Sequence, residues 1–204
     1  MSSEQEVFWQ EEFGDNYTIR NNENTLLANN IELFNKIFLN LNDISNVLEL
    51  GCNRGNNLEA IHSINKNILL NGIDINKSAI EILNNKNICQ NTEVGSIYNI
   101  PKENKFDLVF TKGVLIHIPE DKLSDVLEIM YECSKKYILI CEYYSKNRHE
   151  INYRNFSNKL WKDDFCGKIM QKYNNLEIVD YGFSYHKDPK FPLDDITWFL
   201  LKKC

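Results

Sequence analysis

The sequence predicts a single α/β domain whose mostly parallel sheet of seven strands carries helices on both faces and ends in an antiparallel hairpin. Short apolar runs typical of buried strands alternate with segments of helical spacing between residues 44 and 145, a pattern that favours a parallel sheet. After residue 145 the alternation loosens, and two strand-like segments close the chain. A length of 204 residues with 43% apolar residues suffices for one sizeable core.

The elements of the first half follow in order along the chain. Apolar residues at steps of four, three, four and three predict a helix over residues 23–41. The run 46–50 predicts the first strand, because it is short and apolar and stops at a glycine. A helix over residues 57–64 and a strand over 68–75 come next. Residues 1–22 carry aromatic and acidic side chains without a clean period.

The middle of the chain continues the alternation. Asn76 is a suitable N-cap for a helix over residues 78–83. A weak third strand over 88–95 and a strong fourth strand over 105–113 follow. A helix over 119–133 begins with a proline and two acidic residues, which suit the first turn of a helix.

The last part of the chain is less regular. Residues 137–144 predict a fifth strand, the polar stretch 145–159 a loop, and residues 160–173 a helix. Two strands over 176–186 and 196–203, joined by a turn with two prolines, predict a hairpin added to the edge of the sheet.

Composition excludes several classes of partner. Lys and Arg number 23 and Asp and Glu 29, and the net charge of −6 disfavours a phosphate backbone as main partner. No stretch approaches the roughly 18 apolar residues of a membrane span, and the polar N-terminus does not resemble a secretory signal. The six cysteines form no C-x-x-C pair. We therefore expect no nucleic acid, membrane or metal partner, and a reduced, cytoplasmic compartment.

The loop after the first predicted strand is the most informative segment. In VLELGCNRGNNL, Glu49 precedes Gly51 by two residues and Gly55 follows four residues later. A glycine between a strand and a helix lets the backbone approach a ligand, and the start of the helix offers N–H groups. The G-x-G-x-x-G dinucleotide pattern is not met, because Asn53 and Asn56 stand at glycine positions. A plain strand-to-helix turn is the alternative interpretation.

Asp74 strengthens the prediction of a nucleoside site. It ends the second predicted strand and lies 19 residues after Gly55. An acid about 20 residues after such a loop is placed to accept the hydroxyls of a ribose. The alternative is that Asp74 only starts the turn before Asn76.

Three motifs together resemble class I S-adenosylmethionine-dependent methyltransferases. They are E-x-G-x-x-x-G after the first strand, Gly72–Ile73–Asp74 after the second, and FDLVFTKGVLIHIP around the fourth. The resemblance covers about residues 44–145. It implies the Rossmann-like fold of this class, with S-adenosylmethionine as the cofactor and S-adenosylhomocysteine as the product.

The resemblance also implies which residues contact the cofactor. The family places the methionine part over the first loop, the ribose on the acid that matches Asp74, and the adenine near the turn after the third strand. Ser96 stands in that turn, where an Asp is frequent. The cofactor-binding residues implied for the core are Glu49, Gly51, Cys52, Asn53, Gly55, Asp74, Ile75, Ser96, Ile97, Thr111 and Lys112.

The N-terminal stretch FWQEEFGDNYTIRNN resembles the opening of the pseudaminic acid biosynthesis-associated methylases. The matching positions are Phe8, Trp9, Phe13, Gly14, Tyr17, Arg20 and Asn21. The resemblance implies a place near sialic-acid-like nonulosonate pathways. From chemistry alone, the aromatics suit a lid over the cofactor, and Tyr17 and Arg20 suit its carboxylate. Packing of an N-terminal arm on the core is the alternative.

The chain is therefore interpreted as one methyltransferase domain, 1–204. Residues 1–43 form a lid and helix, 44–145 the cofactor-binding core, and 146–204 an acceptor-side insertion and hairpin. The catalytic candidates are His117, after the fourth strand, and Glu142, at the end of the fifth, because ligands sit beyond the carboxyl ends of parallel strands. A histidine also titrates near neutrality, which suits a base. A structural histidine and a solvated acid are the alternatives.

The predicted acceptor is a small polar molecule, because the sequence lacks the motifs of methyltransferases that act on nucleic acids. The sequence has no N/D-P-P-Y/F/W segment, no Pro-Cys nucleophile and no basic stripe for nucleic acid. We expect methyl transfer to a sugar-related or nonulosonate intermediate. Two other interpretations stay open: a methyltransferase for an unrelated small molecule, and a non-catalytic protein that binds the nucleoside and acts through a partner.

Overall fold

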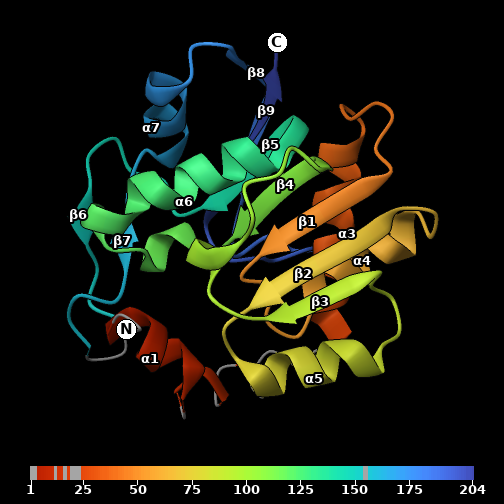
Figure 1. The fold of residues 1–204 in the computed structure, drawn as a ribbon, viewed down its shortest axis with the longest axis horizontal. Coiled ribbons are helices and arrows are strands. Elements are labelled where there is room, and N and C mark those ends of the chain that lie inside the picture. Colours follow the sequence, from red (N-terminus) through yellow and green to blue (C-terminus); the bar gives the residue numbers. More distant parts are fainter. Residues whose placement is uncertain (1–3, 12, 16–17, 19–23, 154–155) are drawn as a thin grey trace.

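A computed structural model describes residues 4–11, 13–15, 18, 24–153 and 156–204. Its centre is a seven-stranded sheet with the order β3-β2-β1-β4-β5-β9-β8 (Figure 1). The strands β1 to β5 run parallel, and β9 and β8 are antiparallel to their neighbours. The predicted sheet, with its C-terminal hairpin, is thus confirmed.

The strands lie close to their predicted positions. The main sheet consists of β1 (Asn46–Leu50), β2 (Leu69–Asp74), β3 (Asn91–Val94), β4 (Phe106–Lys112), β5 (Ser134–Glu142), β8 (Leu176–Ser184) and β9 (Ile196–Lys203). A second sheet pairs the short strands β6 (His149–Glu150) and β7 (Trp161–Lys162). This small pair comes from the segment predicted as loop and helix.

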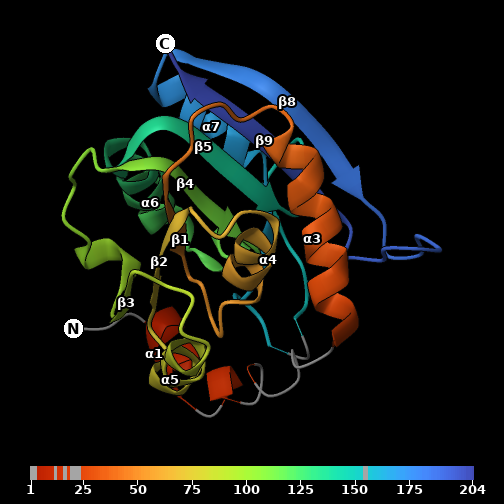
Figure 2. The same ribbon diagram turned by 90° about the vertical axis from the view of Figure 1, so that its right-hand side faces the viewer.

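Helices cover both faces of the main sheet. They are α1 (Glu4–Gln10), α3 (Asn24–Phe38), α4 (Asn56–Ile64), α5 (Lys77–Asn85), α6 (Glu120–Cys133) and α7 (Phe165–Lys172), with short 3₁₀ turns η1 (Ile97–Asn99) and η2 (Leu115–His117). Figure 2 shows α3 and α4 on one side of the sheet and α6 on the other. The side chain of Asn76 accepts a hydrogen bond from the backbone N–H of Ala79, which confirms it as the N-cap of α5.

Each face of the sheet has its own hydrophobic core. Alternate residues of a strand point to opposite faces, so β5 contributes Ile138 and Ile140 to the core under α6 and α7, and Leu139 to the core under α3 and α4. Phe34 of α3 is fully buried and packs edge-on against Phe110 of β4. Central strands buried on both faces explain why their sequences are apolar runs without alternation.

Two predictions about local structure were wrong. The helix predicted over residues 160–173 begins only at Phe165, because the side chain of Asp164 caps it by accepting from the N–H of Gly167 at 2.8 Å. The preceding residues pair as β7 with β6, held by the buried carboxylate of Asp163, which binds Arg148 and Lys168. In addition, helix α1 was not predicted, because its segment has no clean helical period.

Gly55 offers a test of this fold. It starts α4 in the left-handed region with φ of 75°, and an added Cβ would overlap the Cδ1 atom of Leu83. Gly113 has a similar φ of 70° but open space at its Cβ position. We expect Gly55→Ala to lower the free energy of unfolding by about 2–3 kcal/mol and Gly113→Ala by only about 1 kcal/mol. Urea unfolding measures both, and equal losses would contradict the packing role of Gly55.

Candidate active site

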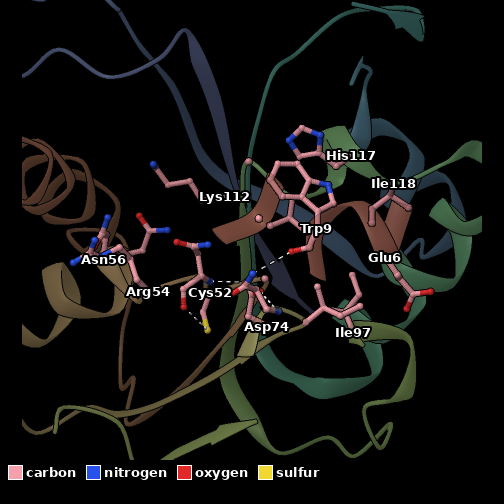
Figure 3. Close-up of a pocket in the computed structure, with 18 of the residues that line it drawn as sticks. Glu6, Trp9, Cys52, Arg54, Asn56, Asp74, Ile97, Lys112, His117 and Ile118 are labelled. Atoms are coloured by element: carbon pink, nitrogen blue, oxygen red, sulfur yellow. Dashed lines mark hydrogen bonds between the residues drawn. The ribbon is translucent and has the colours of Figure 1, made fainter. Parts of the chain in front are cut away.

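A cavity of about 230 Å³ lies at the carboxyl ends of the parallel strands. The loops after β1, β2, β3 and β4 supply much of its wall, and residues of α1 and α3 add to it. Parallel strands bring their carboxyl ends to one edge of a sheet, which is why residues far apart in the sequence meet there. Figure 3 shows ten of the lining residues labelled, with Trp9 between His117 and Asp74.

The loop after β1 bends sharply through the left-handed region. Gly51, Asn53 and Gly55 have φ values of 71°, 46° and 75°. A Cβ on Gly51 would lie 2.6 Å from Cγ2 of Val114, so only glycine lets this loop approach the turn after β4. Asn53 adopts the same region at a position where the dinucleotide pattern has glycine, and asparagine tolerates it better than other side chains.

Asp74 ties this loop to β2. One carboxylate oxygen accepts from the backbone N–H of Asn53 at 2.7 Å, and the other accepts from that of Asn76 at 2.8 Å. Burial raises the pKa of Asp74 above its usual range, and these hydrogen bonds oppose the rise. The side chain lines the cavity. The backbone N–H of Ile75 also bonds to this carboxylate, and the acceptor capacity that remains is available to a ligand.

Glu49 is buried and only half satisfied. Its Oε1 atom accepts from the side-chain amide of Asn57 at 2.6 Å, whereas Oε2 has no hydrogen-bond partner. Burial raises the pKa of Glu49 to about 8, and the charge of Lys112 acts in the opposite direction. Glu49 is not among the residues that line the cavity. A buried oxygen without a donor favours binding of a cation or an N–H group beside it.

Three amide oxygens of the cavity wall also have no hydrogen-bond donor: those of Gln5, Asn30 and Asn53. In two of these side chains, the hydrogen bond made by the amide nitrogen fixes which way the oxygen points. That of Gln5 donates to the backbone oxygen of Asn158 at 3.0 Å, and that of Asn53 donates to the hydroxyl of Thr18 at 2.9 Å. The wall therefore offers acceptors to a ligand that carries hydroxyl or amine donors.

Most of the predicted cofactor residues line this one cavity. Those that do are Gly51, Cys52, Asn53, Asp74, Ile75, Ser96, Ile97 and Lys112. Glu49, Gly55 and Thr111 lie outside its lining. Tyr17, Arg20 and Asn21 lie outside the described residues. The sequence analysis did not assign Asn30, Asn76, Val114 and Ile118 to the site, although all four line the cavity and Val114 and Ile118 lie within the motif around the fourth strand.

His117 forms part of the cavity wall next to Trp9. Its Nδ1 atom lies 2.6 Å from the backbone oxygen of Lys159, which only accepts, so Nδ1 carries the proton and Nε2 is the unprotonated nitrogen. The rings of Trp9 and Tyr153 have centroids 4.5 and 5.3 Å from the imidazole. This enclosure lowers the pKa of His117 to about 4, so the ring is neutral at pH 7.

Glu142, the other predicted catalytic residue, is buried and does not line the cavity. Its Oε1 atom accepts from the backbone N–H groups of Val114 and Leu115 at 3.0 and 3.1 Å, and Oε2 accepts from that of Ile116 at 3.3 Å. Burial raises the pKa of Glu142 to about 7, and these hydrogen bonds oppose the rise. The side chain thus faces the backbone of the turn after β4.

The described residues 4–11, 13–15 and 18, called the N-terminal segment below, pack on the loops after β1 and β2. Thr18 accepts from the Asn53 amide, and its backbone oxygen accepts from Arg54 at 3.2 Å. The carboxylate of Asp15 accepts from the side chains of Asn76 and Ser78 at 2.9 and 2.6 Å. Trp9 lines the cavity, whereas Phe13 does not. The predicted packing of an N-terminal arm on the core is thus seen for these residues, whereas the lid over a cofactor stays a prediction.

Comparisons with known proteins agree with this geometry. Residues 47–136 match a family model described as a methyltransferase domain. No curated protein matches the sequence. Among the described residues, no helix is long and apolar enough to cross a membrane, and no group of three metal-ligating side chains is present.

Solved methyltransferase structures resemble the whole chain. The magnesium protoporphyrin IX methyltransferase ChlM from Synechocystis PCC 6803, with bound SAH, has a TM-score of 0.73 at 12% identity, covering 98% of this chain and 100% of that one. The plantazolicin methyltransferase BpumL in complex with SAH has a TM-score of 0.68 at 16% identity, with coverages of 98% and 93%. A SAM-dependent methyltransferase from Leishmania major reaches 0.72 at 14% identity, with coverages of 97% and 81%. The chain therefore has the Rossmann-like fold of class I S-adenosylmethionine-dependent methyltransferases, and residues 47–136 resemble a methyltransferase domain.

Proposed function

We propose that the protein is an S-adenosylmethionine-dependent methyltransferase that acts on a small polar molecule. The observation that carries this proposal is the cavity, which lies within the methyltransferase fold and gathers Asp74, the glycine loop and the wall of acceptor oxygens. The two solved structures named above with SAH share this fold.

The residues present fit the cofactor. The remaining lone pairs of Asp74 suit the two ribose hydroxyls, and Ile75 and Ile97 offer apolar contacts to a flat base. The unpartnered oxygen of Glu49 suits an ammonium group near the glycine loop. We also propose Tyr17 and Arg20 for the carboxylate, and Gly55, Thr111 and Lys112 as supports. When bound, S-adenosylmethionine supplies an activated methyl group, so the chain has mainly to align the acceptor and exclude water.

His117 is the proposed contact for the acceptor. The backbone oxygen of Lys159 fixes its tautomer, so Nε2 is the nitrogen that accepts a hydrogen bond. A pKa near 4 makes the ring a weak base at neutral pH. The imidazole is therefore better suited to orient a hydroxyl or amine than to remove its proton before transfer. Trp9 covers the ring and shields this part of the cavity from water.

We propose a sugar-related acceptor, such as a nonulosonate intermediate, and a reduced, cytoplasmic compartment. Two features support the acceptor class: the N-terminal pattern of Phe8 to Asn21, and a wall whose unpaired oxygens suit a molecule with many hydroxyl groups. The named structural neighbours act on plantazolicin and magnesium protoporphyrin IX, so the shared fold does not select an acceptor. A different small molecule is the alternative that an acceptor screen would reveal.

Calorimetric titration with S-adenosylhomocysteine tests the proposed function directly. We expect a Kd on the order of micromolar, and no binding of NAD, because the loop after β1 lacks the glycines of a pyrophosphate turn. Binding of NAD alone, or of neither compound, would refute the methyltransferase assignment. Screening of sugar acids and their neutral analogues as methyl acceptors then tests the substrate class.

Asp74→Asn tests the ribose contact. The amide keeps the shape of the side chain but removes its charge and one acceptor oxygen, so S-adenosylhomocysteine should bind at least ~10-fold more weakly. The matched control is Asp107→Asn, since Asp107 is a buried acid at the opposite end of β4 that accepts from Ser45 and Asn46. Unchanged affinity in a folded Asp74→Asn protein would remove this assignment.

Glu49 predicts a dependence of cofactor affinity on pH. With a pKa of about 8 it is mostly protonated at pH 7 in the free protein. An ammonium group bound beside it favours the carboxylate and lowers this pKa, so binding releases a proton. Affinity for S-adenosylhomocysteine should therefore rise between pH 6 and pH 8, by up to about tenfold per unit. Calorimetry in buffers of different ionisation enthalpy counts the proton, and Glu49→Gln should abolish its release.

A further inference from the structure

We propose that Glu142 is a positioning residue that holds the turn after β4 and thereby fixes the His117 imidazole at the cavity wall. Glu142 does not line the cavity, so it acts through the backbone of this turn. The link to methyl transfer rests on the proposed function, whereas the effect on His117 does not.

Four consecutive backbone N–H groups of the turn are paired with the end of β5. Gly113 donates to the backbone oxygen of Cys141 at 2.9 Å. The next three residues, Val114 to Ile116, donate to the two oxygens of Glu142 at 3.0 to 3.3 Å. Only a carboxylate offers enough lone pairs on one side chain to accept all three at once. The turn therefore depends on this one side chain.

The same turn sets the direction of His117. The backbone N–H of His117 donates to the oxygen of Val114 at 2.9 Å, which closes η2 directly on the residues that Glu142 holds. On its other side the imidazole is bound by the Lys159 oxygen. The ring is thus fixed from two directions: by the turn at its backbone and by the segment before β7 at Nδ1.

Two charged side chains approach this region from other elements. Arg148 donates to the backbone oxygen of Ile118 at 2.8 Å, and the ammonium of Lys159 lies 5.0 Å from the ring centroid of Phe8. The carboxylate of Glu142 accepts from the backbone N–H groups of residues 114–116 and from the side chain of Thr111. Its removal therefore acts on the turn and leaves the Lys159 and Arg148 contacts with their partners.

The test is a pH titration of the four histidines by NMR, with His117→Gln to assign the signal. Wild-type His117 should titrate near pH 4, because it is enclosed. Glu142→Gln keeps an acceptor for two of the N–H groups but turns an NH₂ toward the third. Glu142→Ala removes all three bonds. Burial raises the pKa of Glu142 to about 7, so wild-type Glu142 is itself protonated near pH 4 and the Gln variant should titrate like wild type. In the Ala variant we expect the pKa of His117 to move toward 6.5 by about one unit or more.

Asp107→Asn is the matched control for lost stability. Asp107 also accepts three hydrogen bonds on its carboxylate, from the N–H and hydroxyl of Ser45 and the N–H of Asn46, at the far end of β4. This variant should unfold more easily in urea and leave the titration of His117 unchanged. If Glu142→Ala and Asp107→Asn lose similar stability and His117 titrates alike in both, the positioning role is refuted.

Two further readouts keep the result decisive. If acid unfolds the protein before His117 titrates, the ¹⁵N shifts at pH 7 report the tautomer; wild type should show the proton on Nδ1 alone and Glu142→Ala a mixture. An unchanged tautomer would refute the proposal. Titration with S-adenosylhomocysteine separates the two hypotheses, since failure of wild type to bind would refute the proposed function while the NMR result still decides the role of Glu142.

Discussion

Buried carboxylates that accept backbone N–H groups hold the loops around the central strands, and the geometry of the site depends on them. Asp74 joins the glycine loop to the end of β2, and Glu142 joins the turn after β4 to the end of β5. Loops at strand ends leave N–H groups that a buried environment must satisfy. A carboxylate satisfies several of them at once. Its burial costs free energy, and burial raises the pKa of both residues above the usual range.

This arrangement assigns different tasks to acids that look alike in the sequence. Asp74 accepts from backbone N–H groups and still lines the cavity, whereas Glu142 accepts from backbone N–H groups but does not line it. Glu49 accepts from the side chain of Asn57 on one oxygen, and its other oxygen has no hydrogen-bond partner. An acid with spare acceptor capacity is suited to a ligand, and an acid whose oxygens are occupied is suited to support. The distinction follows from hydrogen-bond partners, which a strand-end position in the sequence does not reveal.

The positions of the strands and a good share of the cavity lining could be predicted because both follow local rules. Apolar runs defined the strands, and the parallel arrangement brought Gly51, Asp74 and Lys112 to one edge. Helix α1 was missed because its burial comes from contacts with distant loops, such as the bond of Gln5 to Asn158. The start of α7 was misplaced because Asp164 caps the helix after a strand pair that forms only in three dimensions. Asn30 belongs to the cavity for the same reason: a polar residue in a helix carries no sign of what it will face.

The hydrogen bonds between the N-terminal segment and the loops after β1 and β2 couple the docking of this segment to the binding of a ligand in the cavity. Thr18 and Asp15 bind Asn53 and Asn76, and the backbone N–H groups of these same two asparagines hold Asp74. A ligand that orders the loops therefore also lowers the free energy of the docked segment, and the docked segment raises the affinity for the ligand by the same factor. Residues of this segment such as Trp9 also line the cavity, so retention of a ligand there and protection of the first residues from proteolysis become linked thermodynamic quantities.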